Sequence, residues 1–215
     1  MQAKVKNSQV AYDFILNAIF KGELRAGAAV TEEWLGGHLK MSRTPVREAL
    51  IRLQADGILT DANNRTTVTT ITPVDIKEIF DLRLLLEPYA ASLCIGLIDK
   101  DLVLKIRKHT ETLLEKQEED RSGAPYEIHE LILESTRNRR LITITKNLQS
   151  QIRRVITLGW HIPGLHRRSL EEHVPILDAI LKGDRAMAET HMRQHLRSVM
   201  SDMLDQEKYH FIFRE

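Results

Sequence analysis

The sequence Ser42-Arg43-Thr44-Pro45-Val46-Arg47-Glu48-Ala49-Leu50 decides the fold of the N-terminal third of the chain. Ser42 is a residue type that often precedes a helix, and Pro45 falls in the first turn, where its missing N–H costs little. Apolar side chains follow at helical spacing: Val46, Ala49, Leu50 and Leu53. The stretch therefore predicts an amphipathic helix that opens at Ser42 and stops at Asp56-Gly57.

Two helices are predicted before this one and a hairpin after it. Residues 10–19 carry apolar side chains at helical spacing, and Thr31 can N-cap a short helix that runs to Leu39. Residues 66–71 are rich in threonine and, with residues 58–60, predict a hairpin around the turn 61–64. Three helices followed by a two-stranded wing is the element order of a winged helix-turn-helix domain.

The exposed face of the third helix is a candidate DNA-binding surface. Arg43 and Arg47 are four residues apart, so they share the face opposite the apolar one. Guanidinium groups on a helix in the major groove bind guanine O6 and N7 or phosphate. Ser42 and Thr44 add hydroxyl donors for phosphate oxygens, and Arg65 lies near the wing tip. Alternatively, such arginines only solvate a surface helix, but the helix order and the wing favour DNA binding.

The residues from Ser42 to Leu50, followed by Leu53, Asp56-Gly57 and Leu59, resemble the recognition-helix signature of the GntR family of bacterial transcription regulators. The resemblance extends over the whole N-terminal domain. It implies that Arg43, Thr44 and Arg47 contact operator DNA.

From Pro73 to Tyr209 the sequence predicts about six amphipathic helices and no strand, and short connections of this kind are typical of an antiparallel bundle. Helix breaks are predicted at Ile98-Asp99, residues 122–125, Asn138, Pro163-Gly164 and Gly183-Asp184. The expected fold class is therefore mainly α. We expect a winged helix-turn-helix domain over residues 1–72 and an all-helical antiparallel bundle over residues 73–215.

The helical domain resembles the FCD effector-binding domain of the FadR branch of the GntR family, in its six-helix VanR-like form. Its first helix carries the opening pattern from Asp81 to Pro88, and later helices carry Glu172-His173 and His195-Leu196. The resemblance implies that a small molecule controls operator binding. We expect the protein to act as a repressor of transcription. Because one short helix reads little sequence, we also expect a homodimer that binds a near-palindromic double-stranded operator.

By the same resemblance, His129, His173 and His195 occupy the histidine positions of a divalent-metal site. Each lies among apolar residues of its own helix at inward-facing spacing. Three imidazoles inside a bundle suit Zn²⁺ or Ni²⁺ and leave a coordination position open. Pro125 stands where the family pattern has an aspartate, so an anionic ligand is lost and the site should be weakened.

Two other interpretations of the three histidines stay open. In one, each is a hydrogen-bonded residue of the core. In the other, the chain is a helical-bundle metalloenzyme that uses them as ligands. That alternative leaves the winged domain unexplained, and the sequence offers no general base in a recognisable relation to the histidines.

An organic-acid effector would pair with arginine side chains. The resemblance to the FCD domain places Arg83, Arg153 and Arg154 on helices that line its effector cavity, so we assign them to effector binding with or without a metal.

Ser169 and Glu172 are spaced as a capping box, which predicts a helix start just before His173.

The distribution of charge supports a DNA partner better than the net charge of +1 does. Residues 43–52 hold three arginines and one acid, whereas residues 111–120 hold five acids and one lysine. A local basic patch is what attracts nucleic acid. The sequence shows neither an 18-residue apolar run nor a signal-peptide core, so we expect a cytoplasmic protein without a membrane partner.

Overall fold

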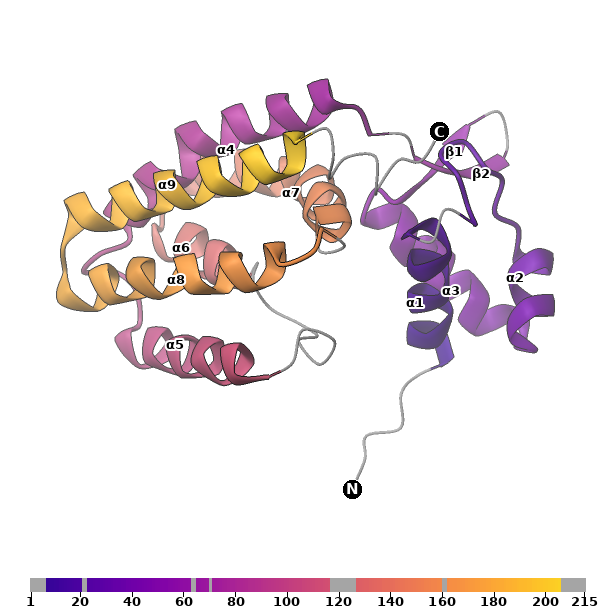
Figure 1. The fold of residues 1–215 in the computed structure, drawn as a ribbon, viewed down its shortest axis with the longest axis horizontal. Helices are drawn as coiled ribbons and strands as arrows, with labels where there is room; N and C mark the ends of the chain where they lie inside the picture. Colours follow the sequence, from indigo (N-terminus) through magenta and orange to yellow (C-terminus); the bar gives the residue numbers. More distant parts are fainter. Residues whose placement is uncertain are drawn as a thin grey trace. The chain divides into compact units, whose positions relative to one another are not determined.

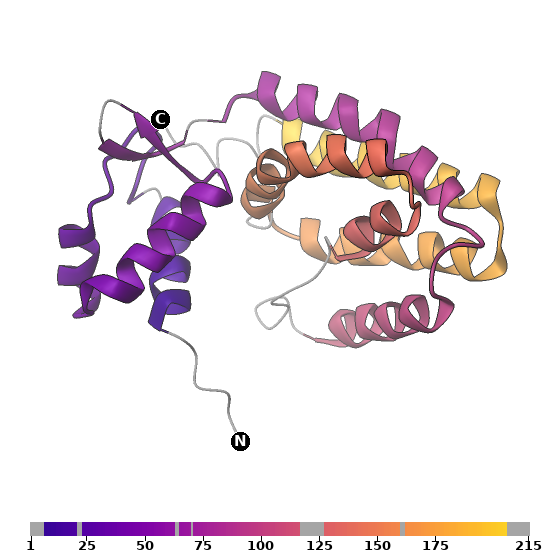
Figure 2. The same ribbon diagram turned by 180° about the vertical axis from the view of Figure 1, so that it is seen from behind.

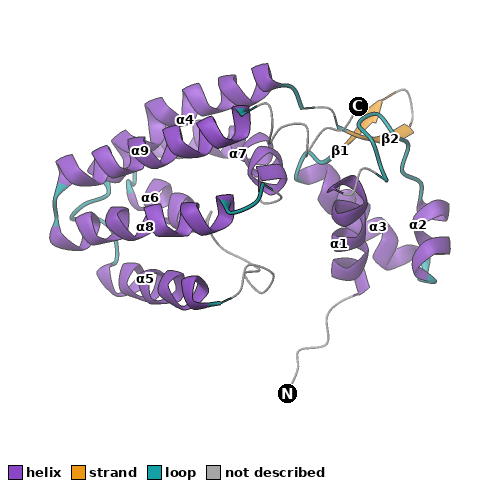
Figure 3. Ribbon diagram, viewed as in Figure 1, coloured by secondary structure: helices purple, strands orange, loops and turns teal. Residues whose placement is uncertain are grey.

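The computed structural model describes residues 7–20, 23–62, 65–69, 71–116, 127–159 and 162–205. These residues divide into two compact units. The first comprises the described residues up to Thr72 together with residues 149–159, and the second comprises the remainder. Figures 1 and 3 show a mainly helical chain with one small hairpin, as the sequence predicts.

The N-terminal part of the first unit has the predicted order of three helices and a wing. Its elements are α1 (Asn7–Phe20), α2 (Glu32–Leu39), α3 (Arg43–Ala55), β1 (Leu59–Ala62) and β2 (Arg65–Val68). The strands pair antiparallel, with Leu59 opposite Val68 and Ala62 opposite Arg65. The predicted turn residues Asn63 and Asn64 lie outside the described residues.

Local signals set the ends of α2 and α3. The Thr31 hydroxyl accepts a hydrogen bond from the Trp34 backbone N–H at 3.1 Å and so caps α2 as predicted. Ser42 precedes α3 but makes no side-chain capping bond. After Asp56, Gly57 adopts a φ of 72°, a left-handed conformation that glycine accepts without strain and that ends the helix.

The buried face of α3 packs on α1 and α2. Leu53 and Val46 are buried in one core with Ile15 of α1. At the end of α3, the Tyr12 hydroxyl donates to Asp56 Oδ2 at 2.8 Å. Burial of Tyr12, followed by the nearby Asp56 carboxylate, raises the pKa of this phenol. These contacts fix the orientation of α3 relative to α1 and α2, with its other face turned to solvent.

The helical region contains α4 (Pro73–Leu93), α5 (Lys100–Glu115), α6 (Glu127–Ser135), α7 (Arg139–Gly159), α8 (Leu165–Lys182) and α9 (Arg185–Leu204), and residues 149–159 of α7 group with the first unit. Six helices in the described residues agree with the prediction. Helix α9 packs against both α4 and α8, while α5 packs on α8 and α6 on α4 (Figures 1 and 2). The inward faces of α4, α6, α8 and α9 thus meet. No helix in the described ranges is long and apolar enough to cross a bilayer.

The predicted capping box at Ser169 and Glu172 is wrong. Helix α8 begins at Leu165, after Gly164 with a φ of 74°, so both residues lie inside the helix. Leu165 and Ser169 are buried with His173, which extends the inward face by more than one turn before the histidine. Burial of this additional turn prevails over the local capping pattern.

Candidate DNA interface and metal centre

The N-terminal half of α3 and the residue before it present four exposed polar side chains: Ser42, Arg43, Thr44 and Arg47. None of the four makes a side-chain hydrogen bond or ion pair with another residue in the described part of the chain. Their donors are therefore available to an external acceptor. Because α3 buries its opposite face in the core, this surface is held rigidly, as recognition of base edges requires.

Arg52, the third arginine of the same helix, has a different role. Its Nη1 donates to Gln9 Oε1 at 2.6 Å, and its guanidinium lies 4.2 Å from the centre of the Tyr12 ring. Arg52 is thus engaged with α1, whereas Arg43 and Arg47 are not. This contrast favours a binding role for Arg43 and Arg47 over simple solvation of the helix.

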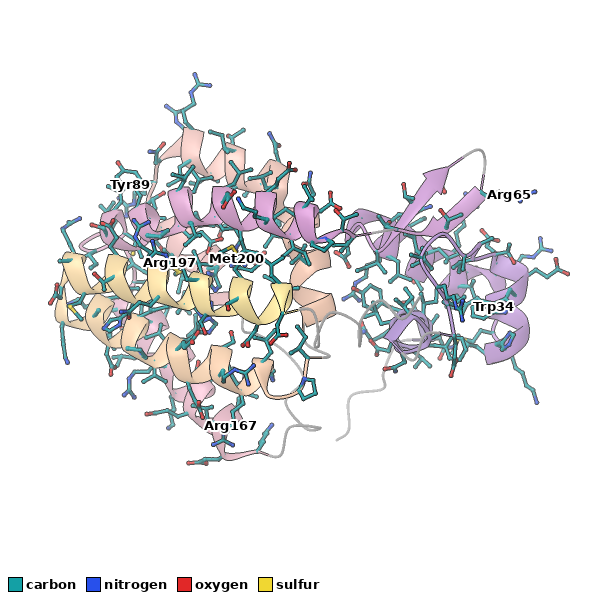
Figure 4. All side chains as sticks on the ribbon, turned by 45° about the horizontal axis from the view of Figure 1, so that its top comes forward. Trp34, Arg65, Tyr89, Arg167, Arg197 and Met200 are labelled. Carbon is teal, nitrogen blue, oxygen red and sulfur yellow. The ribbon has the colours of Figure 1, made fainter. Side chains whose placement is uncertain are left out.

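The hairpin is fastened to α3 by polar contacts. Gln54 Nε2 donates to Asp61 Oδ1 at 2.9 Å, and the Thr66 hydroxyl donates to the same oxygen at 2.8 Å. Arg65 is exposed at the start of β2, and Figure 4 shows it beside the end of the hairpin. Its position at the wing tip is that expected from the sequence.

Inside the bundle, the structure brings the three predicted histidines together. His129 comes from α6, His173 from α8 and His195 from α9, and all three are buried. His173 Nε2 lies 3.2 Å from His129 Nε2 and 3.2 Å from His195 Nε2. Each ring offers a ligand atom within 4.8 Å of those of the other two. Three nitrogen donors from three helices therefore converge on one point.

Two carboxylates that the sequence analysis did not assign to the site hold the outer nitrogens of this cluster. Glu87 Oε2 on α4 lies 2.6 Å from His129 Nδ1, and Glu172 Oε2 on α8 lies 2.9 Å from His195 Nδ1. Glu87 is fully buried, and Glu172 is partly exposed. Each carboxylate lies far in sequence from the histidine that it contacts, 42 residues for Glu87 and 23 for Glu172, so no local pattern indicated these contacts.

The electrostatics of the cluster favour the neutral form of His173 and His195 and the charged form of Glu87. Burial, followed by the neighbouring histidines, holds the pKa of His173 well below its usual value. Burial also lowers the pKa of His195 to about 4, although the hydrogen bond to Glu172 opposes this shift. For Glu87, burial favours the neutral form, but Arg83 and His129 outweigh it and hold the pKa below the usual range. Neutral imidazoles are the form that binds metal ions.

The three arginines assigned to an effector are placed differently from one another. Arg83 is buried on α4 and donates from Nε and Nη2 to Glu87, at 2.6 and 3.2 Å. Arg153 belongs to the other compact unit, is 45% exposed and lies 3.9 Å from Asp56 Oδ1. The Arg154 side chain lies outside the described residues, as does Pro125. Among the described side chains, Arg83 is therefore connected to the histidine cluster, through Glu87.

Comparison with known families agrees with this architecture. Residues 7–68 match the model for bacterial regulatory proteins of the gntR family, and residues 78–198 match the model for the FCD domain. The chain belongs to the GntR family. As a GntR regulator with an FCD ligand-binding domain, it is a DNA-binding transcription regulator, and nothing in the family placement favours the metalloenzyme alternative.

Relatives of this GntR protein cover nearly its whole length. It is 28% identical to the uncharacterized HTH-type transcriptional regulator YdhC of Bacillus subtilis, over 86% of this chain and 85% of that one. It is 26% identical to the gluconate operon transcriptional repressor of the same organism, over 92% and 84%. The solved structure of E. coli McbR/YncC covers 95% of this chain and 99% of its own, with a TM-score of 0.66 and 21% identity, and shows the same fold.

We predict that Arg47→Ala weakens operator binding by about 1–3 kcal/mol and relaxes specificity at one operator position, because a guanidinium fork to a base is lost. The Arg43→Ala, Arg47→Ala double variant should lose specific binding altogether. Fluorescence anisotropy with DNA from upstream of the protein's own gene measures both effects. Wild-type binding should also weaken steeply as salt is raised.

The matched control is Arg167→Ala, which removes an exposed arginine from α8 in the FCD domain. It should leave operator affinity unchanged. The variants on the DNA face should keep the wild-type melting temperature, since the altered side chains are exposed and make no described hydrogen bond or ion pair within the protein. Wild-type operator affinity in the double variant would contradict the assignment of this face.

Proposed function

We propose that this GntR protein is a cytoplasmic homodimeric repressor that binds a near-palindromic operator and releases it when a small organic acid binds at a metal-loaded histidine cluster. The observation that carries the proposal is the convergence of three buried Nε2 atoms in the FCD domain. Arg43, Thr44 and Arg47, with Ser42 and Arg65, are the proposed DNA contacts.

The donor set of the histidine cluster fits Zn²⁺ or Ni²⁺. Zinc–nitrogen bonds of about 2.0–2.1 Å place tetrahedral neighbours about 3.3–3.4 Å apart, close to the two 3.2 Å separations around His173. The three ligands would be His129, His173 and His195, all neutral. When bound, the ion supplies a Lewis-acidic position that an anionic oxygen can occupy.

A carboxylate is the effector chemistry that this site favours. Three neutral imidazoles leave the charge of a divalent ion to be offset by other groups, and a carboxylate oxygen suits the remaining coordination position. A relative of this chain is a repressor of a gluconate operon, and gluconate is itself a carboxylate. We therefore propose a small organic acid as the effector.

An exposed apolar face on α4 supports the homodimer. Val74, Leu82, Leu85 and Tyr89 are between 41% and 71% exposed and lie at helical spacing (Tyr89 is labelled in Figure 4). Exposed apolar side chains that share one side of a helix are typical of protein–protein contacts. Because α4 follows the DNA-binding domain directly in the chain, a second copy on this face would set the spacing of two recognition helices.

Zn²⁺ or Ni²⁺ should raise the melting temperature of the wild-type protein, because a ligand that binds only the folded state stabilises it by mass action. The His173→Ala variant should lose this rise and keep its operator affinity in the absence of metal. The measurement is thermal unfolding during a metal titration of chelator-treated protein. His191→Ala, which changes a histidine outside the cluster on α9, is the control. The absence of stabilisation by any divalent ion would rule out the metal.

Zinc-loaded protein should release its operator when the right organic acid is added. We expect one member of a panel of small monocarboxylates, gluconate among them, to weaken operator binding by about 5–150-fold, the usual range of allosteric coupling. The corresponding amides should have no effect, and His173→Ala should not respond to the acid. An equal response in wild type and variant would show that the acid acts elsewhere.

Leu85→Glu should convert the dimer to a monomer and weaken operator binding, because a charge replaces an apolar side chain that is 71% exposed in the isolated chain. Leu104→Glu on α5, at a position 51% exposed, is the matched control and should remain dimeric. Sedimentation equilibrium measures the oligomeric state of both variants, and fluorescence anisotropy measures their operator binding. A Leu85→Glu protein that is still a dimer would place the interface on another surface.

A further inference from the structure

We propose that Glu87 and Glu172 are positioning residues of the metal centre, which hold the His129 and His195 rings so that both present a lone pair to the ion. We further propose that Arg83 acts through Glu87 and is not an effector contact. The inference rests on the metal binding proposed above. It is carried by four hydrogen bonds inside the bundle, which link these residues to the two rings.

The carboxylates determine which nitrogen of each ring carries hydrogen. An ionised carboxylate only accepts hydrogen bonds, so His129 Nδ1 must donate to Glu87, and His195 Nδ1 must donate to Glu172. In a neutral imidazole the other nitrogen then bears a lone pair. Both Nε2 atoms are therefore set as ligands before any ion arrives.

His173 makes the need for a cation explicit. Its Nε2 lies 3.2 Å from the Nε2 atoms of both His129 and His195. If His173 Nε2 carries a hydrogen, it can donate fully to only one of these two neighbours, and the other contact brings nitrogen atoms together without a shared hydrogen. A metal ion bound to all three nitrogens satisfies every one of them. The two carboxylates thus create a site that an ion completes.

The two carboxylates are held with different firmness. Glu87 is 2% exposed and takes two hydrogen bonds from Arg83, one turn earlier on α4. The Arg83 guanidinium also lies 4.9 Å from the centre of the Phe80 ring, so its orientation is fixed by packing. Glu172, in contrast, is 31% exposed and reaches from α8 to His195 on α9. A change at Arg83 therefore reaches the ion through Glu87 and His129.

The test measures zinc affinity by chelator competition on the full-length protein, in buffers without carboxylates. Glu172→Ala should weaken zinc binding by about 10–100-fold, the usual loss when the partner of a ligating histidine is removed. Glu172→Gln keeps an oxygen acceptor for Nδ1 and should recover most of that loss. Glu171→Ala is the matched control, since its exposed carboxylate pairs with Arg167, and it should bind zinc as the wild type does.

A purely structural role would lower the melting temperature of the metal-free protein and leave zinc affinity unchanged. We expect the reverse for Glu172→Ala, because this side chain is partly exposed. Zinc affinity within about threefold of the wild-type value, well short of the expected loss, would overturn the role of Glu172. If the wild type binds no zinc, the proposed function itself fails at that step.

A second variant tests Arg83 separately. Arg83→Lys keeps the positive charge but loses the paired geometry to Glu87, so it should also weaken zinc binding, with no organic acid present. If Arg83 only contacted an effector, this variant would bind zinc normally and lose its response to acids. That result would overturn the assignment of Arg83 to the metal centre.

Discussion

The need to satisfy buried polar groups organises the helical domain. A continuous chain of close polar contacts runs from Arg83 through Glu87, His129, His173 and His195 to Glu172 and joins α4, α6, α8 and α9. A charged or polar group in such an interior is costly unless each of its partners is in place. The helices are therefore held in one arrangement by chemistry that hydrophobic packing alone does not specify.

On the DNA-binding face, in contrast, the polar groups are exposed and have no described partners within the protein. One side of α3 is buried in an apolar core, and Arg52 and Asp56 connect its C-terminal half to α1 through Gln9 and Tyr12. The other side of its N-terminal half carries polar groups without described partners. Stability and recognition are thus assigned to different side chains of the same helix.

Much of this architecture was predictable from the sequence because its signals are local. The cap at Thr31, the start of α3 and its stop at Gly57 each depend on residues within one turn. The inward spacing of His129, His173 and His195 also predicted their burial. Glu87 and Glu172 escaped prediction because they meet their histidines 42 and 23 residues away, across helix packing. The capping pattern at Ser169 gave a wrong helix start because tertiary burial of an earlier turn, which a local pattern does not reveal, decided where α8 begins.

The separation of tasks along α3 has a consequence for the history of such proteins. The side chains of Ser42, Arg43, Thr44 and Arg47 are exposed and make no described hydrogen bond or ion pair, so selection can exchange them at little cost to the folded protein. After gene duplication, a copy of this regulator is therefore free to acquire a new set of target promoters by a few substitutions on one solvent-facing surface. Its sensor domain, in contrast, would have to change several mutually dependent residues at once.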